Sequence, residues 1–397
     1  MSLIVAFIIV AGSMAIGDIV STKTKAFIPS VFVTAVLFLI GFWTFFPKDI
    51  IVTAGIPIGL VLMSIYLLLV HMGTMMSLKE LAAEWRTIVI AISGIIGLCA
   101  VLLTVGILLV GRETIIIATP PLAGGIVAAL MMSEAAIAKG LTSLAVLAIA
   151  MYVMQGFVGY PLTALSLKKE GLRLLDIYRN NKEELAKLNS KQVSNGKGQE
   201  KSKLQFIPPL GKKYQTTFVL LTKTALVAWA SIAVAGLMND IISKYVICLL
   251  FGVVAVEIGF LERKPITKSN SFGYLALALM AYIFSQLAKA TPEMLKGIAG
   301  PLLLVIIIGV IGLGLISMIV GKLLGYSKEM SFALSLTALY GFPPNYILTE
   351  EAAKSLAETP EENEFLMNQM PPKMLVGGFT TVTIVSVILA GIFIKLL

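Results

Sequence analysis

The second half of this 397-residue chain repeats the first half. Three pairs of segments align in order and at nearly the same offset. The pairs are GDIVS at Gly17–Ser21 with NDIIS at Asn239–Ser243, Gly59–Glu80 with Gly273–Glu293, and GGIVAALMMSEAAIAKG from Gly124 with GFPPNYILTEEAAKSLA from Gly341. In an apolar chain, such a repeat is typical of secondary transporters.

Composition places the chain in a membrane. It is 58% hydrophobic and 13% charged, and its apolar runs reach the roughly 20 residues that a helix needs to cross a bilayer. The first run, Leu3–Val20, has no preceding Lys or Arg and no small-residue cleavage site after it, so we expect a retained helix. Much of the net charge of +9 lies in Lys168–Lys213, which favours a cytoplasmic loop and gives no reason to expect nucleic acid. Cys99 and Cys248 lie within apolar runs, as buried small side chains do.

Hydropathy predicts ten full spans and two shorter elements. The spans are 3–20, 27–46, 52–72, 87–110, 143–165, 217–238, 245–262, 272–290, 297–321 and 372–396. The two remaining apolar segments, 113–140 and 329–358, contain TPPLAGG and GFPPN. Paired prolines and glycines break a helix, and broken backbone at membrane depth survives only where protein or water lines it. We therefore expect both segments to be re-entrant hairpins.

Charge distribution selects the topology. If neither hairpin crosses, Lys23, Lys25, Lys79 and Arg86 fall on the same side as the central loop, whereas two crossing hairpins would move them outside. The predicted fold is therefore an all-α membrane protein of two inverted repeats, 1–166 and 216–397. Each repeat has five transmembrane helices and a re-entrant hairpin before its last helix. A cytoplasmic linker, 167–215, joins them, and both termini lie outside the cell.

The hairpin tips are the predicted substrate site. Gly124 and Gly125 would let a ligand approach backbone amides, and the helix that follows would point its N-terminus at an anion. Asn345 can donate and accept, which suits a carboxylate or an amino acid. The alternative is that these residues only kink helices. The full set of predicted substrate-binding residues is Gly124, Gly125, Gly341, Pro343, Pro344, Asn345, Gln155, Thr380 and Thr381.

Carboxylates with neighbouring hydroxyls are candidates for ion coupling. The repeat pairs Ser133-Glu134 with Thr349-Glu350, and hard oxygen ligands suit Na⁺ or a proton. Glu257, inside a span, is a further candidate. Against this, each glutamate of the pair lies about 13 Å along the helix from its tip, where it could simply be solvated.

Other polar residues have structural explanations. His71 is expected to be a hydrogen-bonded histidine, with proton coupling as the alternative. Asp18 and Asp240 are expected to be caps or interface residues, and Glu351 to be solvated. The acidic segment ETPEENE, 358–364, is expected to be a linker. Lys223 is expected to pair with Glu257 or to extend toward the inside.

The layout resembles that of the glutamate:sodium symporters and the related 2-hydroxycarboxylate transporters. Their hairpins carry Gly-Gly-x-Gly tips, of which Gly124-Gly125 matches the first two glycines, while Gly341-Phe342-Pro343-Pro344-Asn345 departs from the pattern. The resemblance covers nearly the whole chain in layout but is narrow in motif. It implies sodium coupling and an elevator-like movement of a hairpin-bearing core against a dimeric scaffold.

The predicted function is secondary active transport of a small carboxylate-bearing solute, such as an amino acid or a di- or hydroxycarboxylate, driven by Na⁺. The expected location is the plasma membrane, the expected partners are lipid and a second copy of the chain, and no cofactor is expected. One histidine and no G-x-S-x-G or P-loop motif argue against an enzyme. The alternatives are a proton-coupled carrier or exporter, and a non-transporting membrane component, including an enzyme with Asp18 and Asp240 as paired acids.

Overall fold

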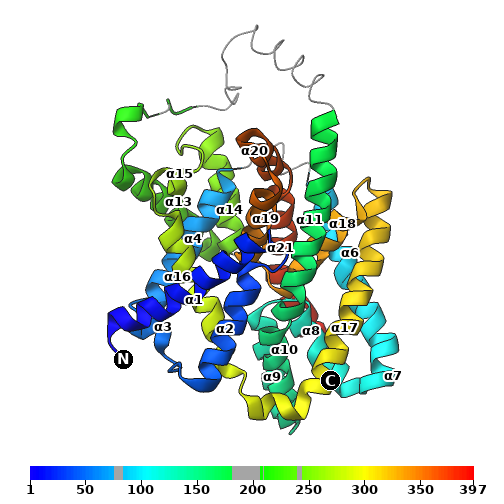
Figure 1. Ribbon diagram of the computed structural model, residues 1–397. Coiled ribbons are helices and arrows are strands. Elements are labelled where there is room, and N and C mark those ends of the chain that lie inside the picture. Colours follow the sequence, from blue (N-terminus) through cyan, green and yellow to red (C-terminus); the bar gives the residue numbers. More distant parts are fainter. Residues whose placement is uncertain (76–83, 181–205, 209, 239–243) are drawn as a thin grey trace. The chain divides into compact units, whose positions relative to one another are not determined.

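The computed structural model describes residues 1–75, 84–180, 206–208, 210–238 and 244–397, and these residues form helices joined by turns and loops (Figure 1). Several predicted features lie outside the described residues: residues 181–205 of the linker, Lys79, and the repeated segment Asn239–Ser243, which includes Asp240. The described chain divides into two compact units. The larger unit comprises Met1–Gly55, Glu84–Gly171 and Met280–Leu397, and the smaller unit comprises Ile56–Ala83 and Leu172–Leu279.

The larger unit holds most of the helices. Its elements are α1 (Leu3–Lys23), α2 (Ser30–Thr44), α3 (Ile50–Thr53), α6 (Trp85–Val101), η1 (Leu102–Gly106), α7 (Ile107–Val110), α8 (Arg112–Leu122), α9 (Ile126–Ala138), α10 (Thr142–Met154), the first part of α11 (Gly156–Asn180), η3 (Gln286–Lys289), α17 (Pro292–Leu323), α18 (Lys328–Leu336), η4 (Thr337–Leu339), α19 (Pro344–Leu356), α20 (Pro360–Gln369), α21 (Pro371–Phe379), η5 (Thr380–Val385) and α22 (Ser386–Leu396). The smaller unit holds α4 (Ile58–Gly73), η2 (Lys212–Tyr214), α13 (Thr217–Leu237), α14 (Lys244–Glu257), α15 (Pro265–Lys268) and the first part of α16 (Phe272–Ser285).

Six helices are long and apolar enough to cross a membrane. They are Leu3–Lys23, Trp85–Val110, Thr142–Asn180, Thr217–Leu237, Phe272–Lys289 and Leu295–Leu323. Helices α2 and α4 are apolar but shorter, at 15 and 16 residues. Each of the ten predicted spans falls on a helix, and the chain has the character of a membrane-embedded helical protein.

The structure differs from the sequence predictions at two polar segments. Helix α11 runs to Asn180, well past the predicted start of the linker at 167, and Glu170 on it accepts a hydrogen bond from Ser327 Oγ at 2.6 Å. The acidic segment predicted to be a linker instead begins helix α20. Thr359 Oγ1 accepts a hydrogen bond from the amide of Glu362, and Pro360 lies in the first turn of the helix. Both features favour the start of a helix, which the acidic composition of the segment does not indicate.

Glycine pairs set how closely two helix pairs cross. In the larger unit, α6 and α17 cross where Gly97 faces Gly312, and an added Cβ on either would collide with the backbone oxygen of the other. In the smaller unit, α4 and α14 cross at Gly73 and Gly252, where an added Cβ on either would collide with backbone of the other helix. Such close backbone approach is typical of helix pairs in membranes.

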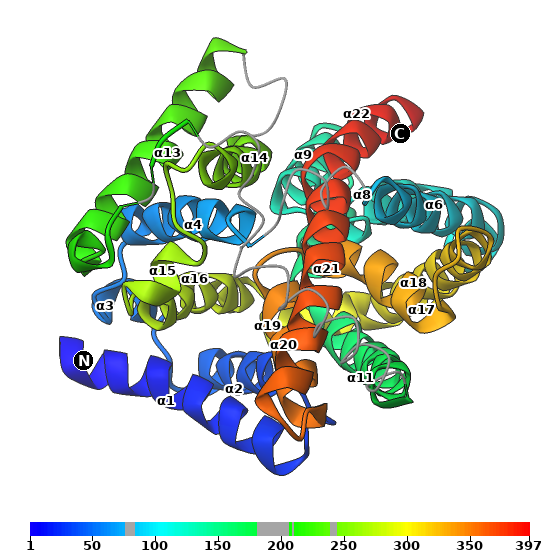
Figure 2. The same cartoon turned by 90° about the horizontal axis from the view of Figure 1, so that it is seen from above.

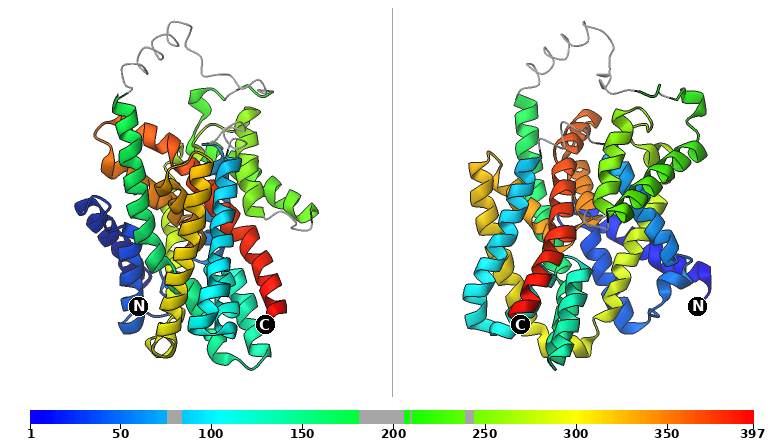
Figure 3. Two further views of the ribbon diagram at one scale, coloured as in Figure 1. Left: turned by 90° about the vertical axis from the view of Figure 1, so that its right-hand side faces the viewer. Right: turned by 180° about the vertical axis from the view of Figure 1, so that it is seen from behind.

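Within the larger unit, the last helix forms an axis for the candidate site. Figure 2 shows α21 and α22 in one continuous line, with α19 and α20 against its first part and α8 and α9 against its second part. The right-hand view of Figure 3 shows α22 descending beside the pair α8 and α9 to the C-terminus.

Candidate functional site

Two interrupted helical segments approach the middle of the larger unit. In the first, α8 and α9 pack against each other and are joined by a turn at Ala123–Gly125. In the second, α18 leads through η4 and Tyr340–Pro343 into α19. In Figure 1, α8 and α9 lie in the lower part of the view, and α19 and α20 lie in the upper part. The turns fall at the two predicted tips.

The two turns contact each other and the last helix. Gly124 and Gly125 have φ of +112° and +91°, which glycine adopts without strain. An added Cβ at Gly124 would lie 2.6 Å from the oxygen of Ala338, and one at Gly125 would lie 2.9 Å from the oxygen of Val382. A Cβ at Gly341, whose φ is +65°, would lie 3.0 Å from the side chain of Val382. Both turns therefore close on the same residue of η5.

The last helix changes its winding at that contact. Between α21 and α22, Thr380–Val385 forms a π-helical stretch, and such stretches in α-helices are frequent at functional sites. The predicted ligand Thr380 donates to the oxygen of Val376 at 2.8 Å, and Thr381 donates to that of Gly377 at 3.1 Å. Both hydroxyls thus bond to their own helix, as threonines in apolar helices commonly do.

Asn345 ties the second turn to the last helix. Its side chain is fully buried, Nδ2 donates to the oxygen of Met374 at 2.9 Å, and Oδ1 accepts from the amide of Tyr346 at 2.7 Å. Pro343 and Pro344 are buried at the start of α19. The side-chain amide of Asn345 is therefore used to position α19, and a ligand at this turn would meet mainly backbone.

The predicted ion-coupling residues are not gathered into one site. Glu134 is exposed on α9, Ser133 beside it is half-buried, and Glu350 pairs with Lys354 at 2.7 Å. Thr349 is buried and donates to the oxygen of Asn345. Glu257 ends α14 in the smaller unit. Among the described residues, no group of three or more His, Cys, Asp or Glu side chains could hold a metal ion.

Glu351, expected to be solvated, is instead a half-buried hydrogen-bond acceptor. Its Oε2 accepts from the Ser21 hydroxyl at 2.9 Å and from the Ser30 amide at 3.1 Å, and its Oε1 accepts from the Ser30 hydroxyl. Burial raises the pKa of Glu351, hydrogen bonds from Ser30 and Ser21 oppose the rise, and the nearby Asp18 adds to it. The two serines precede it by more than 300 residues in the chain, so sequence reasoning missed this contact.

His71 has the structural role that was expected. It is 1% exposed, its Nδ1 accepts from the amide of Ile266 at 3.3 Å, and its Nε2 lies 3.3 Å from the hydroxyl of Thr267. Because Nδ1 accepts, Nε2 carries the proton and donates to Thr267. The histidine thus fastens α4 to the start of α15. Nearby in the same unit, Lys223 pairs with Glu262 at 2.7 Å, the partner that the sequence did not predict.

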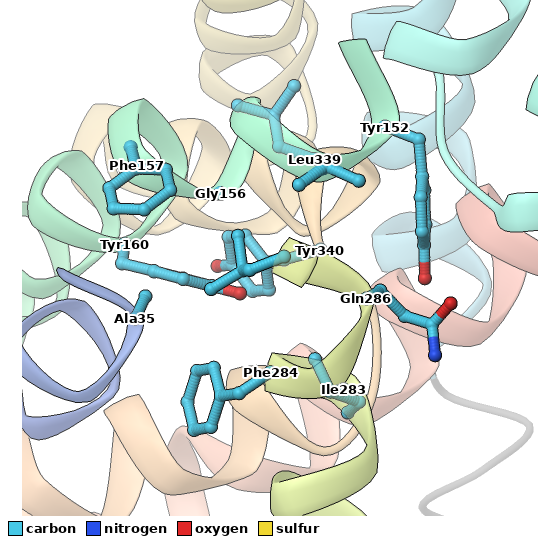
Figure 4. A pocket seen from close by; sticks show the side chains of 12 residues that line it. Ala35, Tyr152, Gly156, Phe157, Tyr160, Ile283, Phe284, Gln286, Leu339 and Tyr340 are labelled. Carbon is cyan, nitrogen blue, oxygen red and sulfur yellow. The ribbon is translucent and has the colours of Figure 1, made fainter. Parts of the chain in front are cut away.

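An aromatic cleft lies beside the second turn (Figure 4). Its cavity volume is about 40 Å³, and the cleft is partly open to its surroundings. The lining residues come from α2, α10, α11, α16, η3 and the second turn, and they are Ala35, Tyr152, Val153, Gly156, Phe157, Tyr160, Ile283, Phe284, Gln286, Leu287, Leu339 and Tyr340. The cleft is lined mainly by aromatic and aliphatic side chains, and none of these residues is charged.

Gln155 lies at the break between α10 and α11, next to the cleft residue Gly156. It is 1% exposed, and its Oε1 has no hydrogen-bond partner within the described part of the chain. A buried acceptor without a partner is costly. Of the predicted substrate-binding side chains, Gln155 is the one whose acceptor the protein leaves unused.

Comparison with protein families and with curated proteins does not assign this chain to a family. The chain matches no protein-family model, and no curated protein is significantly similar to it in sequence. Function is therefore inferred from the residues of the chain itself.

Proposed function

We propose that this protein is a secondary active transporter for a small carboxylate-bearing solute, coupled to Na⁺, in the plasma membrane. The proposal rests on one observation: the two turns that interrupt helices both contact the π-helical stretch of the last helix. The Gly124-Gly125 turn and the Gly341 turn both close on Val382, within the π-helical stretch of the last helix. Discontinuous helices that meet inside an apolar bundle are the common construction of transporter binding sites.

The order of elements supports two repeats. A four-residue helix precedes a longer apolar helix twice, as α3 with α4 and as α15 with α16. Helices α9 and α19, which follow the two turns, are both 13 residues long. In this proposal the halves are inverted, α8–α9 and α18–α19 are re-entrant hairpins, and the protein is a homodimer that moves its hairpins in an elevator-like way.

The substrate carboxylate would lie at the start of α9. Gly125 is the residue before the first turn of that helix, and first-turn amides together with the helix dipole favour an anion. The coupling ion would be held by backbone oxygens and hydroxyls near the turns. Glu134, exposed, and Glu350, paired with Lys354, are less suited to that role.

The test is uptake into proteoliposomes containing the full-length protein. Labelled amino acids, dicarboxylates and hydroxycarboxylates would be offered with and without an inward Na⁺ gradient, and sodium-dependent accumulation is expected. Gly125→Leu, which forces a side chain against the oxygen of Val382, and Asn345→Ala are expected to abolish it while folded protein remains. Wild-type rates in both variants would refute the assignment of the turns.

A proton-coupled carrier is the second candidate, and Glu351 is the observation that favours it. A half-buried carboxyl held by Ser21 and Ser30, with a raised pKa, keeps its proton to higher pH than an exposed carboxyl does. Uptake that follows an inward pH gradient, persists without Na⁺ and is lost in Glu351→Gln would select this candidate over the first.

A further inference from the structure

The cleft beside the second turn is built from rings. Tyr152 on α10, Phe157 and Tyr160 on α11, Phe284 on α16 and Tyr340 on the turn contribute five aromatic side chains. Figure 4 shows Tyr160, Tyr340 and Phe284 bordering one space, with Gln286 and Tyr152 at another edge. A cleft without a charged lining residue offers an ionic group little, whereas ring faces and edges favour another flat apolar group.

The cleft also has polar atoms to orient a ligand. The hydroxyl of Tyr340 donates to Thr163 at 2.7 Å and is therefore occupied. The hydroxyls of Tyr152 and Tyr160 have no hydrogen-bond partner in the described part of the chain, and both residues line the space. Two such hydroxyls in an aromatic cleft suit the polar edge of a small organic molecule, because tyrosine can both donate and accept.

The cleft adjoins the proposed transport site. Leu339 and Tyr340 line it, the neighbouring Gly341 contacts Val382, and the oxygen of Ala338 faces Gly124 of the first turn. The segment Ala338–Gly341 thus has the cleft and the first turn as neighbours. A solute whose carboxylate approaches the turns would have its remaining part beside the rings.

We propose that the transported solute is an aromatic carboxylate, a class that includes the aromatic amino acids, and that the ring of this solute occupies the cleft. The inference rests on the proposed function for its carboxylate, while the ring site rests on the cleft itself. Tyr160 is the residue that should discriminate most, because it lines the space with both its ring and an unpartnered hydroxyl, and its ring centroid lies 5.3 Å from that of Tyr340.

Two measurements on the full-length protein test the proposal. Thermal unfolding in detergent would be followed with phenylalanine and phenylacetate, and with the aliphatic probes alanine, glutamate and lactate. Uptake of the same five labelled solutes into proteoliposomes would be measured under Na⁺ and pH gradients. The variants are Tyr160→Leu and, as a matched control, Phe45→Leu, whose aromatic side chain is 71% exposed and outside the cleft.

The expected result is that the aromatic probes stabilise the wild type and the control, and accumulate in their vesicles. Tyr160→Leu should weaken aromatic binding by roughly tenfold, the size of effect typical for losing a ring contact and one hydrogen bond. Accumulation of glutamate or lactate without any response to aromatic probes would overturn the aromatic assignment and leave transport intact. Binding of aromatic probes, lost in Tyr160→Leu, without accumulation under either gradient would uphold the cleft and refute transport. Equal aromatic binding by Tyr160→Leu and wild type, or no response to any probe, would overturn the inference.

Discussion

The two helix breaks that meet at Val382 are built in different ways. The first is a sharp turn in which two successive glycines have positive φ, and the helices on either side, α8 and α9, pack against each other. The second is longer: α18 passes through η4 before reaching Gly341 and α19. Its two helices have mostly different neighbours: α18 packs mainly on α6 and α17, α19 packs mainly on α20 and α21, and α21 contacts both.

The difference shows which part of the chain fixes each turn. The first turn depends on backbone freedom, because both glycine positions face backbone oxygens at short range. The second depends on side-chain hydrogen bonds, because Asn345 joins α19 to α21 through Met374. Substitutions should therefore act by steric strain in the first turn and by loss of polar contacts in the second.

The largest effect is expected in the first turn, from Gly124→Ala. The added Cβ would lie 2.6 Å from the oxygen of Ala338 and the residue would keep a φ of +112°, so we expect a loss of about 3 kcal/mol in unfolding free energy and loss of uptake. Thermal unfolding and proteoliposome uptake would measure both. Gly12→Ala on α1 is the matched control, since an added Cβ there meets nothing within 4 Å. Equal behaviour of the two variants would show that the first turn tolerates side chains.

In the second turn, Asn345→Ala should cost about 2 kcal/mol. The variant removes the donor to the buried oxygen of Met374. It also removes the side-chain acceptor of the Tyr346 amide, which keeps only its bond to the oxygen of Pro343. The exposed Asn368 on α20 provides the control, because surface substitutions usually change stability by less than about 0.5 kcal/mol. If Asn345→Ala unfolds at the same temperature as Asn368→Ala, the second turn is held by backbone, like the first.

A third test uses pH, because the two segments place this carboxyl differently. With Gly124 set against Gly341, Glu351 aligns with Glu134, and Glu134 is exposed whereas Glu351 is half-buried. Burial raises the pKa of Glu351 above its usual 4.5, so the folded state binds the proton more tightly than the unfolded state. Stability should be greatest below pH 4.5 and fall as pH rises through the higher folded pKa, and this part of the slope should vanish in Glu351→Gln.

Thermal unfolding from pH 4 to pH 8 would show the effect as a difference between wild type and Glu351→Gln. Asp18, Glu350 and Lys354 are the other charged groups near this region. All three are present in both proteins, so the comparison cancels much of their contribution. A wild type whose stability rises with pH relative to the variant would mean that the hydrogen bonds from Ser21 and Ser30 outweigh burial.

The smallest effects are expected at two of the predicted ion-coupling residues, Glu134 and Glu350. Glu134 is exposed, and Glu350 forms an i,i+4 pair with Lys354, an arrangement worth about 0.5 kcal/mol or less. Changing either to Gln should leave stability within that range and leave the sodium dependence of uptake unchanged. A weaker sodium dependence in either variant would make that residue an ion ligand and bring the two segments closer in function.

Features that are local in sequence were predicted well. Each predicted span falls on a helix, and the turns occur at the glycines and prolines that break the apolar pattern, because hydropathy and missing amide donors act over a few residues. The start of α20 was missed because a run of acidic residues also suits a loop. The sequence does carry its start signal, since Thr359 is followed by Pro360 and, three residues on, by Glu362, whose amide donates to Thr359.

Features that join distant segments were not predictable from one sequence. Glu351, and not its neighbour Glu350, is the half-buried acceptor because Ser21 and Ser30 lie next to it in the fold. The aromatic cleft likewise brings together rings from α10, α11, α16 and the second turn. Tyrosines spaced along separate helices look like ordinary core residues until the fold places them together.

The crossing of α6 and α17 at Gly97 and Gly312 has a mechanical consequence. Where the backbones touch, sliding one helix along the other would push a carbonyl oxygen into a neighbouring peptide group. The contact therefore fixes the position of one helix relative to the other. Helices α6 and α17 would then move together as a rigid body. Helices α4 and α14, which are in close backbone contact at Gly73 and Gly252, would do the same. In the proposed transport cycle, we expect helices to slide where longer side chains separate them and not at these two crossings.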